Sequence, residues 1–385
     1  MYRNIYFDGT LINKVGIDRI ELKKVVLKEI DEEVLKQSMT YCEVRYDNEC
    51  VHGRQFYITD NEVKFCYLRI VDNELGTLTF GIKNKQYGIY EFSPKESYGG
   101  INLVNYSAQE IHAFIAIATI KLKEKYGLDV EFEYSEIRQI ELNTTFALEH
   151  KFGEYRRTLA VMMFKVPHLN KDSVYGKDDK KTKSKVISGH TVYNGQMSIC
   201  VYNKTKEMEF AIKKTSEIVV YDDDGVVVEE DLMRVESKIK NYDSVVKKFH
   251  GKSKLKDLTD SLVKQVFEEI CSFYLYKPYE QWKANNRKEL RKNVRDAIKD
   301  HRNWKIYLLE KLRNSEQCTS IPVLLEMNDL YDILNEFPDQ SRHVKRRKSG
   351  FKLQKNDVFL QGDHAKYIEI LDNLKLAIKN TGNTI

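Results

Sequence analysis

The stretch LMRVESKIK, residues 232–240, decides the fold because charged and uncharged residues alternate along it. The charged residues at its centre are Arg234, Glu236 and Lys238, and the residues between them are apolar or small. A period of two is typical of a β-strand with one face packed in a core and the other free for charged groups. The stretch therefore predicts a strand that presents cations and a carboxylate on one face.

About thirty residues earlier, VYNKTKE, residues 201–207, ends an apolar run that also predicts a strand. A side chain at a strand end, such as Tyr202, can reach a cleft while its backbone stays rigid. Its phenol, with a pKa of about 10, is a weak nucleophile until a cation or metal favours the phenolate. If the strand continues to Lys204, both side chains share a face, and the ammonium could stabilise the phenolate or an anionic transition state. The pair suggests phosphodiester cleavage through a covalent tyrosyl intermediate.

Hard oxygen ligands for a divalent cation occur on a further predicted strand. Glu141 and Asn143 share one face of RQIELNTTF, residues 138–146, and their oxygens suit Mg²⁺ or Mn²⁺. Glu236 is either another ligand or the ion-pair partner of Arg234. Each residue also fits an ordinary role, because strand tyrosines usually pack and strand carboxylates are usually exposed.

Composition indicates a folded soluble protein. The chain has 385 residues, enough for about two or three domains, with 42% hydrophobic and 31% charged residues. The net charge of +5 is too small to indicate a nucleic-acid partner by itself. No run approaches the roughly 18 apolar residues of a membrane helix, the first residues do not resemble a secretion signal, and the cysteines form no CxxC pair. We expect a cytoplasmic protein with reduced thiols and no membrane contact.

The pattern along the chain predicts an α+β domain with an antiparallel sheet over residues 40–242, followed by an all-helical domain over residues 243–385. Residues 1–39 receive no role. Strands are expected within residues 40–93, at 130–148 and at 189–203. A helix is expected at 107–126, with Ser107 and Glu110 as a capping box and Gly127 as its stop. A second helix is expected at 154–164, and the lysine-rich segment 171–185 is expected to be a mobile loop.

Two basic stretches lie in the expected helical domain. Residues 342–355 contain seven Lys or Arg and no acid, which favours phosphate contact. The DNA-binding residues assigned there are Arg342, Lys345, Arg346, Arg347 and Lys348. Residues 283–302 contain eight Lys or Arg and three acids. For this stretch, phosphate contact and a solvated helix face with ion pairs four residues apart both stay open.

Four blocks in sequence order resemble the gene II replication initiators of filamentous phages and their relatives on plasmids and mobile elements. The blocks are FSPKESYGGIN (92–102), IRQIELNTT (137–145), TVYNGQMSICVYNKTKE (191–207) and LMRVESKIKN (232–241). They resemble the family's Ser-Pro segment, its Arg-Ile-Asp strand, its Tyr-x-Lys-x-x-Glu block and its Arg-Phe-Glu-x-Arg strand. The resemblance covers about residues 90–250.

The resemblance implies a rolling-circle initiator with an HUH-endonuclease-like fold. Such an enzyme nicks one strand at an origin, keeps the 5′ phosphate on its tyrosine, leaves a 3′ hydroxyl to prime synthesis, and later rejoins the displaced strand. The implied catalytic residues are Tyr202 and Lys204, and the implied metal ligands are Glu141, Glu207 and Glu236. Arg234 and Lys238 are assigned to DNA. The implied cofactor is Mg²⁺ or Mn²⁺, and the implied partners are single- and double-stranded origin DNA and a host helicase or polymerase.

The sequence departs from the family at several positions. None of the nine His has the His-x-His spacing with which the wider superfamily binds metal, Glu141 replaces an Asp, and Gln139 stands where the family has Arg. Tyr193 is an alternative or second nucleophile. A conjugative relaxase with the same chemistry, a DNA-binding replication regulator without enzymatic activity, and a structural protein whose tyrosines only pack remain alternatives.

Overall fold

A computed structural model of the chain forms two compact units. Unit 1 comprises residues 1–147, 193–268 and 376–385, and unit 2 comprises residues 148–192 and 269–375. The division differs from the expected boundary at residue 242, because the segment that follows residue 242 packs within unit 1 up to residue 268. The structure describes residues 3–6, 14–31, 33–34, 42–45, 67–72, 74–81, 84–93, 106–164, 168–169, 171–178, 185–211, 218–221, 231–277, 279–280, 284, 287–288, 291–292, 295–296 and 361–381.

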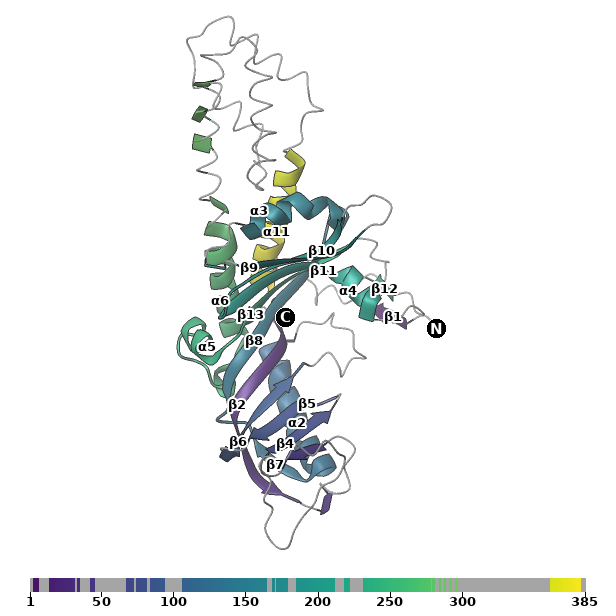
Figure 1. Cartoon of the computed structure of the whole chain (residues 1–385), viewed down its shortest axis with the longest axis vertical. Helices are drawn as coiled ribbons and strands as arrows, with labels where there is room; N and C mark the ends of the chain where they lie inside the picture. Colours follow the sequence, from purple (N-terminus) through teal and green to yellow (C-terminus); the bar gives the residue numbers. More distant parts are fainter. Residues whose placement is uncertain are drawn as a thin grey trace, which may run out of the picture. The chain divides into compact units, whose positions relative to one another are not determined.

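Unit 1 is built on an antiparallel sheet, in agreement with the expected α+β class. The strand order is β3(Cys42–Arg45), β4(Tyr67–Asp72), β5(Gly76–Gly81), β6(Asn84–Phe92), β2(Gly16–Ile30), β8(Glu136–Ala147), β13(Leu232–Ile239) and β11(Met197–Asn203). Strand β7(Leu128–Glu131) also pairs with β2. A separate parallel pair joins β1(Arg3–Tyr6) to β12(Ile218–Tyr221). In Figure 1, β2, β8 and β13 run side by side along the middle of the sheet.

Strand β2 lies in the segment to which we assigned no role. It has fifteen residues and pairs with β6, β7 and β8, so it is central to the sheet. Its pairing with β8 shifts register between Ile17 and Arg19, which leaves Asp18 as an extra residue in a bulge. Bulges re-aim side chains and often lie beside functional sites.

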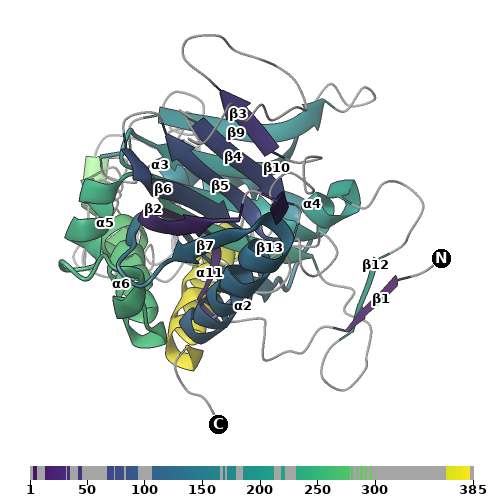
Figure 2. The same cartoon turned by 90° about the horizontal axis from the view of Figure 1, so that it is seen from below.

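Helix α2(Ala108–Tyr126) forms where the sequence predicts it. Ser107 and Glu110 form the expected capping box, and the chain leaves the helix at Gly127 with φ of 66°. A Cβ on this glycine would lie 2.4 Å from the carbonyl oxygen of Asp31. The apolar stripe of α2 is buried, and Figure 2 shows the helix beside β7 along one face of the sheet.

The two faces of the central strands differ in character. Leu142 and Phe146 of β8 and Val235 and Ile239 of β13 are buried on one face. The opposite face of the same strands presents acids, amides and cations, because side chains alternate along a strand. The alternation expected for residues 232–240 is confirmed, and it places a polar patch on a rigid sheet.

Other elements refine or correct the sequence expectations. The stretch 130–148 forms two strands, β7 and β8, and the stretch 189–203 is divided between β10(Lys185–Tyr193) and β11. The Asn194 carboxamide oxygen accepts hydrogen bonds from the backbone N–H groups of Gln196 and Met197 and so closes the turn between them. The expected loop 171–185 is wrong in part, because β9(Lys171–Asp178) forms there. Residues 46–66 of the region 40–93 in which strands are expected, and the basic stretch 342–355, lie outside the described residues.

The remaining elements are mostly helical. They are the 3-10 turn η2(Phe152–Tyr155), α3(Arg156–Phe164), α4(Lys204–Ala211), α5(Tyr242–Lys248), the 3-10 turn η3(Leu255–Asp257), α6(Asp260–Cys271), the π-helical turn η4(Ser272–Tyr276) and α11(Gln361–Asn380). Within unit 2, Glu369 of α11 accepts hydrogen bonds from the Tyr155 hydroxyl at 2.6 Å and the Glu149 N–H at 2.9 Å. Cys200 and Cys271 are not joined in disulfide bonds. No helix in the described part of the chain is long and apolar enough to span a membrane.

Candidate active site and metal centre

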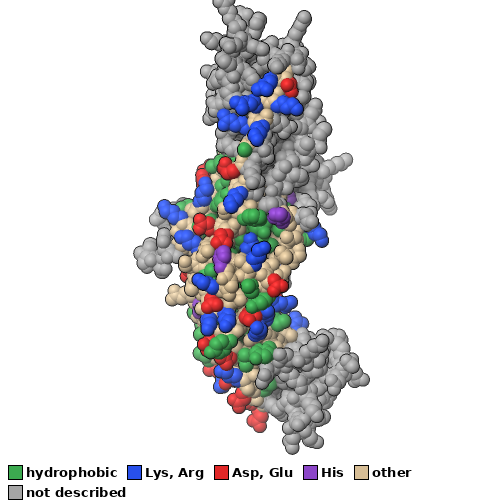
Figure 3. All heavy atoms as spheres, turned by 90° about the vertical axis from the view of Figure 1, so that its left-hand side faces the viewer, with side chains coloured by type: hydrophobic (Ala, Val, Ile, Leu, Met, Phe, Trp, Pro, Cys, Tyr) green, Lys and Arg blue, Asp and Glu red, His purple; other side chains and the backbone are tan. Residues whose placement is uncertain are grey.

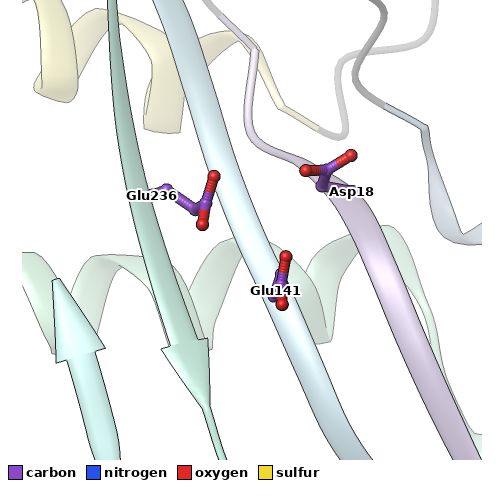
Figure 4. A group of neighbouring side chains, drawn as sticks. All are labelled: Asp18, Glu141 and Glu236. Atoms are coloured by element: carbon purple, nitrogen blue, oxygen red, sulfur yellow. The ribbon is translucent and has the colours of Figure 1, made fainter. Parts of the chain in front are cut away.

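Three carboxylates from three neighbouring strands of unit 1 converge on the polar face. One carboxylate oxygen each of Asp18 (β2), Glu141 (β8) and Glu236 (β13) lies within 4.8 Å of the others. Figure 4 shows these side chains on adjacent strands. Asp18 and Glu141 are buried, and Glu236 is half-buried. We call these three residues the acid group.

Asn143 completes the oxygen-rich patch. It pairs with Glu236 in the register of β8 and β13, and it lies two residues from Glu141, so all three share a face. Its side chain is fully buried, and neither its amide nitrogen nor its amide oxygen has a hydrogen-bond partner in the described structure. A buried amide without partners costs free energy, which a ligand beside it would offset.

The pKa of the Glu236 carboxyl reflects its burial and the charges of the other two acids. Burial, followed by the charges of Glu141 and Asp18, raises its pKa from 4.5 to about 7, against the opposing effect of Arg234 and Lys204. Three carboxylates so close together repel one another, and a divalent cation relieves that repulsion. The donor set of carboxylate and amide oxygens suits Mg²⁺ or Mn²⁺, so these residues fit the implied metal.

Tyr202 lies beside the acid group. It pairs with Arg234 in the register of β11 and β13, and its hydroxyl donates a long hydrogen bond of 3.4 Å to Oε2 of Glu236. Burial raises the pKa of the phenol well above 10, Arg234 lowers it, and Glu236 raises it further. Tyr202 is therefore a protonated phenol at neutral pH, and its hydroxyl proton already points to a carboxylate.

Lys204 supports Tyr202 from a different direction than expected. Strand β11 ends at Asn203 and α4 begins at Lys204, so the condition under which the two side chains would share a strand face is not met. The Lys204 side chain is fully buried, with Nζ 5.9 Å from the centre of the Tyr202 ring and 2.5 Å from Oε2 of Glu207. Burial and then Arg234 lower the pKa of Lys204 to about 8, while Glu207 raises it. Glu207 thus pairs with Lys204 and does not belong to the acid group.

The two cations of β13 have different surroundings. Arg234 is fully buried, and its Nε donates to the hydroxyl of Thr145 at 2.8 Å. The register of β11 and β13 places its charge beside Tyr202. Lys238 is partly exposed, and its Nζ lies 2.5 Å from Oε1 of Glu141. Its ammonium therefore neutralises one carboxylate of the acid group.

The structure brings together Tyr202, Glu141 and Glu236 from the expected site and adds Asp18, which sequence reasoning missed. The signal that could have found Asp18 is the pair of adjacent charged residues, Asp18 and Arg19, that interrupts the alternation of GIDRIEL, residues 16–22. The expected DNA contacts Arg342, Lys345, Arg346, Arg347 and Lys348 lie outside the described residues. Tyr193 ends β10, and Nζ of Lys240 lies 4.9 Å from its ring centre.

Comparisons with known proteins find similarity of structure but not of sequence. No family model matches the chain, and no curated protein matches its sequence. A solved structure, a rolling-circle replication initiator protein from Geobacillus stearothermophilus, is similar with 11% identity and a TM-score of 0.36. The match covers 68% of this chain and 85% of that chain. The case for function therefore rests on the site itself.

Proposed function

We propose that this chain is a metal-dependent strand-transfer endonuclease that starts rolling-circle replication by nicking one strand of origin DNA through Tyr202. The observation behind the proposal is the 3.4 Å contact between the Tyr202 hydroxyl and Glu236, which belongs to the acid group. A nucleophile and a set of hard oxygen ligands thus share one face of a rigid sheet. Phosphoryl transfer needs this combination of an activated nucleophile and charge stabilisation at the phosphate.

The metal would be held by Asp18, Glu141 and Glu236, with the amide oxygen of Asn143 as a further ligand. When bound, Mg²⁺ or Mn²⁺ supplies a Lewis acid that polarises the scissile phosphate. The buried amide of Asn143 and the elevated pKa of Glu236 support this assignment, because both features describe a site that favours a cation. Glu207 is left out of the ligand set, since its carboxylate is paired with Lys204.

The residues around Tyr202 move its proton and stabilise its charge. Glu236 accepts the hydroxyl proton along the hydrogen bond already present. The phenolate oxygen forms a bond to phosphorus and the bond from phosphorus to the 3′ oxygen breaks. The 3′ oxygen takes up a proton from solvent, and Glu236 returns its proton to solvent, so the protons balance. The buried charges of Arg234 and Lys204 favour the phenolate and the anionic transition state. The reverse transesterification rejoins the displaced strand.

The proposed partners are the origin in single- and double-stranded form and a host helicase or polymerase that extends the nicked strand. A relaxase would use the same residues on a transfer origin, so the DNA substrate separates the two functions.

The decisive experiment incubates the chain with a labelled library of single-stranded oligonucleotides and Mn²⁺. Tyr202→Phe is expected to abolish nicking and to leave DNA affinity unchanged, because only the reacting hydroxyl is removed. Tyr193→Phe is the matched control and is expected to nick normally. Nicking by Tyr202→Phe would overturn the proposal, and wild-type DNA binding without any cleavage would favour a regulator without enzymatic activity.

A further inference from the structure

Lys238 and Glu141 form an ion pair within the proposed metal site. They face each other in the register of β13 and β8, and Nζ of Lys238 lies 2.5 Å from Oε1 of Glu141. Paired charges are common on this protein, and Figure 3 shows Lys and Arg side chains interspersed with Asp and Glu side chains on one face of the described structure. The pair of Lys238 and Glu141 differs from an ordinary surface ion pair, because its carboxylate belongs to the acid group.

Two cations flank Glu141 in the register of the sheet. On the side of β2, Arg19 faces Glu141, and its guanidinium pairs with Glu91. On the side of β13, Lys238 faces Glu141 and pairs with it. Within the part of the chain that the structure describes, Lys238 is therefore the flanking cation that neutralises Glu141.

A divalent cation and the ammonium of Lys238 compete for Glu141. Mg²⁺ lies about 2.1 Å from its oxygen ligands, so a metal on Oε1 would lie less than about 5 Å from Nζ of Lys238. Two positive charges at this separation repel each other, and both draw on the same carboxylate charge. Metal binding therefore favours a position of the ammonium away from Glu141.

The ammonium has a path away from Glu141. The side chain of Lys238 is 28% exposed and that of Glu141 is 10% exposed, so the lysine is the partner that can move toward solvent. On the side of β11, Lys238 faces Ser198, which is small and half-buried. The neighbouring strand thus leaves room for the lysine side chain to change its position.

Glu236 lies between Lys238 and the nucleophile along β13. Residues of an antiparallel strand rise about 3.4 Å each, so Lys238 lies about 7 Å from Glu236 and about 14 Å from Arg234, the register partner of Tyr202. A DNA strand whose scissile phosphate lies between Tyr202 and the acid group would bring a neighbouring phosphate toward Lys238.

We propose that Lys238 couples metal binding to DNA binding. In the metal-free protein its ammonium pairs with Glu141, and when a divalent cation occupies the acid group the ammonium contacts a phosphate next to the scissile one. The inference rests on the proposed function, because it uses the same metal and the same DNA. It adds that each ligand strengthens the binding of the other, since both favour the same position of Lys238.

The test measures affinity for a fluorescent single-stranded oligonucleotide by anisotropy, with a chelator and with saturating Mn²⁺. Every protein carries Tyr202→Phe, so that no DNA is cut. Mn²⁺ is expected to raise the DNA affinity of the parent about five- to tenfold more than that of Lys238→Met. With chelator the two affinities should be nearly equal, because Glu141 holds the ammonium of the parent.

Lys240→Met is the matched control. Lys240 lies two residues further along the chain, and its Nζ donates to the backbone carbonyl of Asn194 at 3.1 Å. This variant should respond to Mn²⁺ as the parent does. Lys238→Arg, which keeps the cation, should retain the coupling, and thermal melting shows that each variant remains folded.

An equal effect of Mn²⁺ on Lys238→Met and on its parent would overturn the inference, because Lys238 would then contact DNA in both states or in neither. An equal reduction in Lys240→Met would also overturn it, because the effect would then not depend on Glu141. Nicking is assayed separately in proteins that keep Tyr202. Absence of nicking with the expected coupling would contradict the proposed function alone, and normal nicking without the coupling would contradict this inference alone.

Discussion

Replacing Glu236 by Gln is expected to stabilise the metal-free protein while abolishing its stabilisation by Mn²⁺. The reason is that the carboxylate is costly without a cation: burial, Glu141 and Asp18 raise its pKa from 4.5 to about 7. A carboxyl with a raised pKa contributes stability below pH 4.5 and loses it as the pH rises to about 7. Gln resembles the protonated carboxyl, so the variant keeps that stability at every pH.

The magnitude follows from the pKa difference and from the geometry. A shift from 4.5 to about 7 corresponds to about 3 kcal/mol, at about 1.4 kcal/mol per pH unit. Burial is the largest cause of this shift, and the repulsion between carboxylates that lie within 4.8 Å of one another adds to it, with an order of magnitude of about 3.5 kcal/mol per pair at an effective dielectric constant of about 20. The variant should exceed the wild type in free energy of unfolding by about 3 kcal/mol at pH 8, and by less than about 1 kcal/mol at pH 5.

The assay is urea unfolding at both pH values, with a chelator and then with Mn²⁺. At a hundredfold excess over its Kd, Mn²⁺ should add about 2.7 kcal/mol to the wild type and almost nothing to Glu236→Gln. Glu207→Gln is the matched control, because its carboxylate pairs with Lys204, and it should keep the Mn²⁺ effect. A stability difference that does not change with pH, or equal stabilisation of wild type and Glu236→Gln by Mn²⁺, would refute the reasoning.

Three further predictions concern the surroundings of the acid group and the fold. The pKa of Lys204 is lowered to about 8, so native stability should rise with pH between about 8 and 10.5. In urea unfolding, the free energy of unfolding of the wild type should gain about 2 kcal/mol over that of Lys204→Met between pH 7 and pH 9.5. A difference between the two proteins that does not change with pH would count against the buried ammonium. Lys238→Met should bind Mn²⁺ about tenfold more tightly than the wild type, because the ammonium no longer competes with the metal for Glu141. Electron paramagnetic resonance measures this affinity, and an unchanged affinity would mean that the ion pair of Lys238 with Glu141 does not compete with metal. Gly127→Ala should lower the free energy of unfolding by about 1–3 kcal/mol, since its Cβ would meet the carbonyl of Asp31, and a loss below about 0.5 kcal/mol would show that the turn relaxes.

Local signals predicted the elements that depend on local physics. Helix α2 has a capping box, an apolar stripe and a terminal glycine, all encoded within twenty-one residues. Strand β13 has an unbroken period of two, which fixed the face on which Glu236 lies. These patterns need no knowledge of distant contacts.

The parts that were missed depend on long-range pairing. Strand β2 breaks its own alternation at the Asp18 bulge and again near Lys24, whose φ of 58° is left-handed, so no clean period marks it. Asp18, Glu141 and Glu236 meet only because β2, β8 and β13 are neighbours, although each is separated from the next by about a hundred residues or more of sequence. Glu207 was assigned to the metal from the resemblance, and the sequence did not show that α4 begins at Lys204.

The most direct test of the central claim is to map the peptide that becomes linked to DNA. The full chain is incubated with a labelled single-stranded library and Mn²⁺, digested with protease, and examined by mass spectrometry for a nucleotide adduct. The account predicts an adduct on Tyr202 that disappears in Tyr202→Phe. An adduct on Tyr193 or any other residue, or cleavage of the DNA without a covalent adduct, would contradict it.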